Sequence, residues 1–152
     1  MHENRAQEET QARLLSGADR AAGPPSAVPV REYTFRLADL PRAREFAADS
    51  ARRHDMGEEF VGDFLIAVNE VATNAVTHGA GKAMIRIWPA DGHLVVAVHD
   101  DGLWLPEEPP GQIPPPPNAT SGMGLWVARL LSARIAFSTG SSGTTVTMAF
   151  KV

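Results

Sequence analysis

Three polar side chains that can take part in chemistry follow one another at intervals of four residues: Glu70, Asn74 and His78. In an α-helix, residues four apart lie on neighbouring turns of the same side, so a carboxylate, a carboxamide and an imidazole would form one row. Such a row is typical of an ordinary solvated helix face. It is also typical of one wall of a site that binds a metal ion and an anionic ligand, and these three residues alone do not decide between the two interpretations.

The segment from residue 58 to residue 78 has the periodicity of the helix that would carry this row. With Phe60 set at zero and about 100° added per residue, its apolar side chains fall in one sector of about 160°. This sector contains Phe60, Val61, Phe64, Leu65, Val68, Val71, Ala72, Ala75 and Val76. Such a stripe packs best against a broad surface, most simply a sheet. Ile66 lies outside the stripe with Asp63, Glu70 and Asn74, so we expect the polar side not to be entirely open solvent.

The remaining elements follow from period-two alternation for strands and from helix-start and helix-stop residues. The predicted order is a strand at 31–37, helices at 41–54 and 58–78, strands at 83–88 and 93–99, a helix at 121–131, and strands at 134–138 and 144–150. In the last helix, the side chains that can be buried are Leu125, Val127, Ala128, Leu130 and Leu131. This order predicts an α+β fold, a two-layer α/β sandwich with helices on one face of a mixed, largely antiparallel sheet.

Two stretches do not fit a packed element. Residues 1–30 have few large apolar side chains and end in a proline cluster, which predicts a flexible N-terminal tail before a folded domain at 31–152. Residues 103–121 are rich in proline, which neither helices nor strands tolerate. A loop of this length is typical of a lid or binding loop, and Pro114–Pro117 also suit a polyproline segment that a partner recognises.

Composition argues against several classes of function. The 152 residues carry a formal net charge of −4, whereas a nucleic-acid-binding domain is usually basic. No apolar run approaches the roughly 20 residues of a membrane span, and residues 1–30 lack the apolar centre of a secretory signal. The absence of cysteine excludes disulfides and thiolate chemistry. We therefore expect a cytoplasmic protein with no direct nucleic-acid or membrane partner.

Two further patterns favour a ligand site, although each is common elsewhere. The strand at 93–99 runs into Asp100-Asp101-Gly102, where glycine permits close approach of the backbone to a ligand. Gly122 and Gly124 open a helix, and backbone N–H groups at such a helix start can close on a phosphate.

The order of these patterns resembles the ATP-binding domain shared by gyrases, heat-shock chaperones, mismatch-repair ATPases and histidine kinases. More narrowly, it is similar to the anti-sigma regulatory factor and serine-protein kinase branch of that superfamily. The resemblance spans residues 31–150 and implies the histidine-kinase-like ATPase fold. It rests on four segments, Asn69–Gly79, Val98–Gly102, Ser121–Leu125 and Gly143–Val146.

The resemblance implies ATP and Mg²⁺ as ligands and assigns roles to the helical row. Asn74 would ligate Mg²⁺ through its carboxamide oxygen, a donor that suits this hard cation. Glu70, one turn earlier, would be the catalytic general base. His78 would pack at the helix end rather than catalyse, and residues 103–121 would be the nucleotide lid.

The same resemblance implies how the rest of the nucleotide would be held. Asp100 would accept a hydrogen bond from the adenine amino group, and Gly102 would let the backbone pass close to the nucleotide. The other cofactor-binding residues would be Gly122 and Gly124, which offer N–H groups to the phosphates, and Thr145, which lies near the adenine.

The implied function is that of an ATP-binding anti-sigma regulatory protein, which binds a sigma factor and phosphorylates a serine of an antagonist protein in bacterial partner switching. A homodimer through the region of Arg31–Leu37 is expected with it. The chain departs from the family pattern at Trp104, where a glycine is usual, and in residues 103–121, which contain no Lys or Arg to assist phosphoryl transfer. The alternative hypothesis is a nucleotide-responsive protein-binding module without effective kinase activity, and a third is a structural domain with an empty pocket.

Overall fold

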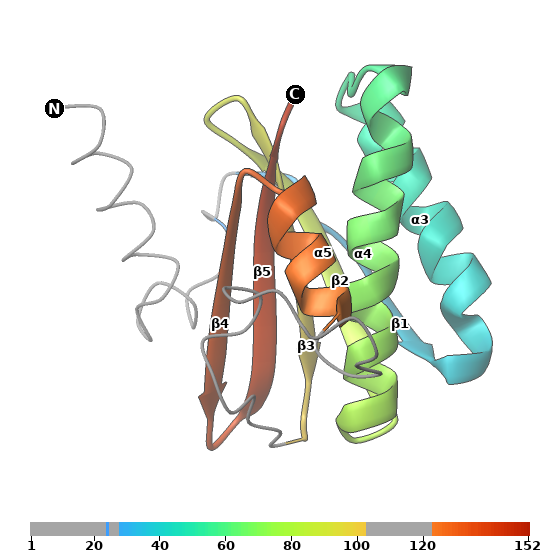
Figure 1. Cartoon of the computed structure of the whole chain (residues 1–152), viewed down its shortest axis with the longest axis vertical. Coiled ribbons are helices and arrows are strands. Elements are labelled where there is room, and N and C mark those ends of the chain that lie inside the picture. The colour runs from blue at the N-terminus through green and yellow to red at the C-terminus, as the bar shows by residue number, and fades with distance from the viewer. Residues whose placement is uncertain (1–23, 25–27, 103–122) are drawn as a thin grey trace, which may run out of the picture.

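The elements follow one another in the predicted order. The computed structural model describes residues 24, 28–102 and 123–152. Its elements are β1 (Arg31–Arg36), the 3-10 turn η1 (Leu37–Asp39), α3 (Leu40–Arg53), α4 (Glu58–His78), β2 (Lys82–Ala90), β3 (His93–Asp100), α5 (Met123–Leu131), β4 (Arg134–Gly140) and β5 (Gly143–Lys151) (Figure 1). Within these ranges, no helix is both long enough and apolar enough to cross a membrane.

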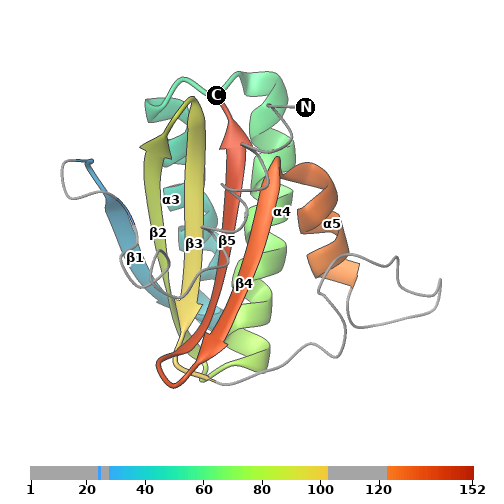
Figure 2. The same cartoon turned by 90° about the vertical axis from the view of Figure 1, so that its left-hand side faces the viewer.

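The five strands form one sheet in the order β1-β2-β3-β5-β4, with β1 and β4 at its edges. All four neighbouring pairs are antiparallel, so the sheet is antiparallel rather than mixed. The turn between β2 and β3 is formed by Asp91 and Gly92, whose φ angles of 50° and 74° are those of a tight hairpin turn. Figure 2 looks onto the sheet, and α3, α4 and α5 all lie behind it. The predicted two-layer α+β sandwich is thus confirmed.

The main core lies between the helices and the sheet, and α4 crosses its centre. Phe64 of α4 meets Phe150 of β5 edge-on, with 4.8 Å between ring centroids. Most of the predicted α4 stripe is buried, but Phe60, at the edge of the stripe, is 58% exposed. Leu130 of α5 is 61% exposed because it lies about 200° around the helix from the buried Ala128.

The other face of the sheet carries a smaller apolar cluster, formed by Trp88, Val95, Ala97 and Ala149. Val28 and Val30 pack against this cluster, so residues 28–30 belong to the folded structure rather than to a tail. Apart from Pro24, the rest of the predicted tail lies outside the described residues.

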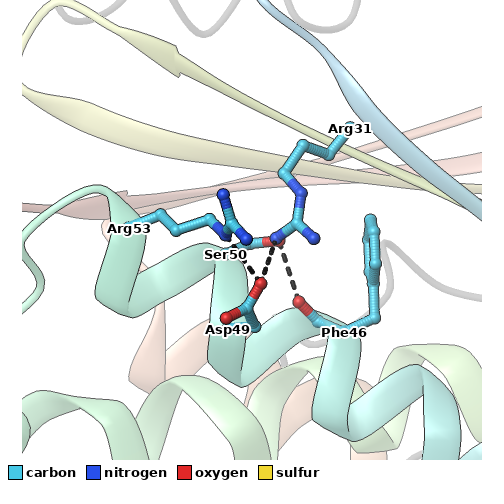
Figure 3. Close-up of polar contacts among 5 residues, drawn as sticks. All are labelled: Arg31, Phe46, Asp49, Ser50 and Arg53. Carbon is cyan, nitrogen blue, oxygen red and sulfur yellow. Dashed lines mark hydrogen bonds and ion pairs between the residues drawn. The ribbon is translucent and has the colours of Figure 1, made fainter.

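Edge strand β1 is tied to α3 by an arginine–carboxylate cluster (Figure 3). The Asp49 carboxylate lies 3.0 Å from Arg31 of β1 and 2.8 Å from Arg53, one turn further along α3. Arg31 also donates to the buried Ser50 hydroxyl at 2.7 Å, and its guanidinium lies 4.8 Å from the centre of the Phe46 ring. The hydrogen bond from Arg53, reinforced by the charges of Arg53 and Arg31, lowers the pKa of Asp49 below its usual value.

Candidate functional site

Glu70 and Asn74 lie one turn apart on α4, on the side turned away from the buried stripe. Both side chains are half-buried, whereas Val71 and Ala75, which follow them, are in the core. His78, the third member of the predicted row, is exposed in the last turn of the helix. The helix therefore presents a carboxylate and a carboxamide oxygen together at a surface that is neither core nor open solvent.

The start of α5 closes against the carboxylate. A Cβ atom added to Gly124 would lie 2.5 Å from Oε2 of Glu70, closer than real Cβ contacts allow. Glycine at this position therefore lets α5 lie against Glu70 without displacing its carboxylate. The structure thus brings together Glu70 and Gly124, which are 54 positions apart in the sequence and which were both predicted as site residues.

The Asp100 end of β3 meets the C-terminal end of α4. Asp100 is 2% exposed, and its Oδ1 accepts a hydrogen bond of 2.7 Å from the backbone N–H of Gly102. A Cβ on Gly79 would collide with the Asp100 carboxylate, and a Cβ on Gly102 would lie 2.8 Å from the backbone nitrogen of Ala80. The two glycines therefore permit a close backbone approach that buries one carboxylate at the helix end.

Thr144, rather than Thr145, belongs to this part of the site. Thr144 pairs with Asp100 across β3 and β5, is 2% exposed, and donates a 2.9 Å hydrogen bond to the Gly102 carbonyl. Thr145 alternates to the other face of the sheet, where its hydroxyl lies 2.7 Å from Nδ1 of His99. The structure thus places Thr144 beside Asp100 and Gly102, and Thr145 on the opposite face of the sheet. The sequence carried this information only as strand register, which two adjacent threonines leave undecided.

Helix geometry fixes the spacing of these groups. With a rise of about 1.5 Å per residue, Asn74 lies about 7.5 Å and Glu70 about 13.5 Å along α4 from Gly79, which contacts Asp100. The site is therefore a line of groups along one helix, with Asp100 at one end and the Glu70–Gly124 contact at the other. Figure 1 shows this arrangement, with the C-terminal ends of α4 and β3 together and α5 beside the middle of α4.

Sequence reasoning missed a cation beside this line. Arg44 of α3 donates a 2.9 Å hydrogen bond to Oδ1 of Asn69, the residue before Glu70.

Gly122 and the predicted lid at 103–121 lie outside the described residues. In the part of the chain that is described, no group of three or more His, Asp or Glu side chains is arranged to hold a metal ion by itself.

Comparison with known proteins identifies the family. Residues 33–150 match the model of the histidine kinase-like ATPase domain, so the chain belongs to this family, as the resemblance of its motifs predicted. No curated protein matches the chain.

Solved structures share the fold. The structure of the RsbU and RsbW domains of Rv1364c from Mycobacterium tuberculosis is similar with a TM-score of 0.60 and 20% identity, over 81% of this chain and 32% of that one. The present chain thus spans about a third of the length of that protein chain. The histidine kinase domain of the blue-light-activated histidine kinase from Erythrobacter litoralis EL346 is similar with a TM-score of 0.51 and 21% identity, over 91% of this chain and 70% of that one.

Proposed function

We propose that this histidine kinase-like ATPase domain binds ATP with Mg²⁺ and transfers the γ-phosphoryl group to a serine of an antagonist protein, as an anti-sigma regulatory kinase. The observation that carries the proposal is the closure of Gly124 onto Glu70, at the far end of a line that begins at Asp100. An adenine nucleotide is an elongated ligand with a donor-bearing base at one end and a reactive phosphate at the other. The base would lie at the Asp100 end of the line, and the reactive phosphate would lie at the Glu70–Gly124 end.

The Asp100 end suits the adenine base. The carbonyls at the C-terminal end of a helix carry partial negative charge, so a carboxylate buried there favours a ligand that donates hydrogen bonds. The exocyclic amino group of adenine is such a donor. Thr144 and the Gly102 N–H hold the turn that carries this carboxylate, and we infer that they fix its direction.

The middle of the line suits a phosphate-bound Mg²⁺. This ion prefers hard oxygen donors and is commonly held by one or two protein groups together with substrate phosphates, not by a full protein cage. Asn74 offers such an oxygen, and the lack of a three-residue metal cluster in the described chain agrees with this mode. When bound, Mg²⁺ would neutralise charge on the phosphates, and Asn74 would hold it there.

Glu70 is positioned for proton transfer at the phosphate end. In the proposed step, the serine oxygen forms a bond to the γ-phosphorus, and the bond from that phosphorus to the β,γ-bridging oxygen breaks, which releases ADP. The hydroxyl proton passes to the Glu70 carboxylate. Gly124 would keep its backbone N–H beside the transferred group, at the start of α5 where the helix dipole favours negative charge.

A second candidate function is a nucleotide-responsive binding module without effective phosphotransfer. It is favoured by how little positive charge two parts of the chain offer to the γ-phosphate. Residues 103–121 contain no Lys or Arg, and Arg44 is engaged with Asn69. Phosphoryl transfer generally needs positive charge at the γ-phosphate in addition to Mg²⁺.

The regulatory part of the proposal is supported by the family branch that the motifs resemble and by the RsbW domain named in a similar structure. We propose a sigma factor and an anti-anti-sigma antagonist as partners, and a homodimer as the working form. The same evidence supports a cytoplasmic location.

The deciding experiment measures ATP binding and single-turnover transfer of labelled γ-phosphate to antagonists encoded beside this gene. We expect Glu70→Gln to retain ATP·Mg²⁺ binding and to lose transfer, and Asn74→Ala to lose the Mg²⁺ dependence of binding. Glu45→Gln, an exposed change on α3, serves as the control for both. Tight ATP binding with no transfer to any antagonist would favour the binding module, and absence of ATP binding would refute both candidates.

A further inference from the structure

We propose that the outward ridge of α4, formed by Glu59, Gly62, Asp63 and Ile66, docks the acceptor segment of the protein substrate, a segment with an apolar and a basic side chain beside its serine. The proposal rests on the proposed function, because it names the partner surface for the same site. The ridge leads along the helix to Glu70, which lies about 6 Å beyond Ile66 at a rise of about 1.5 Å per residue.

Ile66 is the apolar residue of the ridge and lies at the end nearest to Glu70. It is 49% exposed, although its neighbours Ala67 and Val68 are buried in the core. A single exposed apolar residue needs no explanation in itself. Ile66, however, stands in one row between Asp63, three residues earlier, and Glu70, four residues later, so it borders the site.

The carboxylates of the ridge are available to a cationic partner. Glu59 and Asp63 are both exposed, and neither forms an ion pair with another described residue. Glu58, in contrast, lies 2.8 Å from Arg52 of α3. Asp63, three residues before the exposed Ile66, complements a segment that carries Lys or Arg next to an apolar residue. Glu59 adds negative charge at the start of the helix, where its carboxylate lies against Gly57.

Among the described residues, no neighbour requires a glycine at position 62. A glycine inside a helix is less favourable than alanine, because its backbone loses more conformational freedom on folding. At Gly124 the close approach of Glu70 accounts for the glycine, but a Cβ on Gly62 would meet no described residue within 4 Å. An exposed helical position without a side chain lets the backbone of a partner come close to the helix, beside Ile66.

The spacing predicts the form of the acceptor segment. Along α4, Ile66 lies about 6 Å and Asp63 about 10 Å from Glu70. An extended peptide advances about 3.3 Å per residue. With the serine hydroxyl at Glu70, the apolar side chain would stand about two residues from the serine and the basic side chain about three residues from it. Both would be N-terminal to the serine, or both C-terminal to it.

The test uses the full chain with Mg²⁺ and two kinds of synthetic peptide, each made in both chain directions. The basic peptide has one serine, with leucine two residues and arginine three and four residues from it. A matched peptide has glutamate in place of arginine. Binding is measured by fluorescence anisotropy with a non-hydrolysable ATP analogue, and transfer with labelled ATP.

We expect the basic peptide to bind at least 10-fold more tightly than the acidic one. Asp63→Lys should remove this preference, and Ile66→Ser should weaken binding of the basic peptide several-fold. Leu130→Ser is the matched apolar control, because Leu130 is also exposed but lies on the outward side of α5, and Glu45→Lys on α3 is the matched charge control. Neither control should change binding.

The outcomes separate this proposal from the proposed function. Binding that depends on Asp63 and Ile66 without any transfer supports the ridge and counts against the kinase. Transfer that Glu70→Gln abolishes, but that the two ridge variants leave unchanged, supports the kinase and overturns the ridge. Equal binding of the basic and acidic peptides, or no binding of either, also overturns the ridge.

Discussion

Replacement of Gly124 by alanine tests the geometry of the catalytic end with one added methyl group. The new Cβ would lie 2.5 Å from Oε2 of Glu70, so this oxygen has to retreat by about 0.9 Å to an ordinary contact of 3.4 Å. A misplacement of about 1 Å in a reacting group can cost about 10²-fold in rate, which corresponds to about 2.7 kcal/mol in the barrier. Alanine keeps the backbone N–H that the phosphates would use. We therefore expect Gly124→Ala to lower the turnover number about 100-fold and to change the affinity for ATP by only a few-fold.

The fold should tolerate this substitution. The clashing atom is the far end of a flexible side chain, and alanine suits a helix at least as well as glycine does. Thermal unfolding should thus show an unchanged or slightly raised melting temperature for Gly124→Ala. Gly62→Ala is the control for helix propensity, because its Cβ would meet nothing within 4 Å.

The assay is single-turnover phosphotransfer with ATP binding measured in parallel. Wild-type turnover in Gly124→Ala, in a protein that Glu70→Gln inactivates, would refute the inference that this contact positions the base. A loss of turnover accompanied by an equal loss of ATP binding would refute it as well, because the added methyl group would then act on the nucleotide and not on Glu70.

Three further predictions concern the adenine end and the sheet edge. Thr144→Val should weaken ATP binding and cost about 1–3 kcal/mol of stability because it leaves the Gly102 carbonyl without its donor, whereas Thr145→Val, on the other face, should leave ATP affinity unchanged in calorimetry. Gly143→Ala should lower the melting temperature sharply, since φ is 115° there and the new Cβ would collide with the Asp100 carbonyl, and a wild-type melting temperature would contradict the described turn. Asp49→Asn should destabilise the protein at pH 7 but not at low pH. The lowered pKa of Asp49 means that its stabilisation is present above its unfolded pKa and lost as the pH falls through the folded pKa, so the melting temperatures of the two proteins should converge once the pH is below the folded pKa.

The sequence predicted the bounds of an element best where a single hydrophobic periodicity runs through the whole element. Helix α4 begins at Glu58 and ends at His78, the predicted bounds, because a long apolar stripe and a glycine after its end leave little freedom. The exposed Phe60 and Leu130 show the limit of this reasoning. A helical angle predicts which side of a helix is apolar, but not how far the partner surface extends around its edge.

Contacts between distant segments could not be predicted in the same way. That Gly79 receives the Asp100 carboxylate, and that Gly124 meets Glu70, depends on how two elements dock to within a few ångströms. The resemblance to a family names Glu70, Asp100 and Gly124 as site residues, but it does not say which residues they touch. That Thr144, and not Thr145, lies beside Asp100 could not be predicted for a related reason, since a shift of one residue in strand register exchanges the two faces of a sheet.

The composition of α4 becomes intelligible once its sides are considered separately. Its apolar side is held by packing in the core, which stabilises a helix more than intrinsic propensity does. Because packing stabilises the helix, its other side can carry residues with low helix propensity. These are Asn74 in the nucleotide line and Gly62 on the ridge. Alanine at Gly62 would favour the helix, and in the part of the chain that the structure describes no atom lies where its Cβ would stand. Glycine at this exposed position leaves room for the backbone of a partner beside Ile66, as the proposed ridge requires.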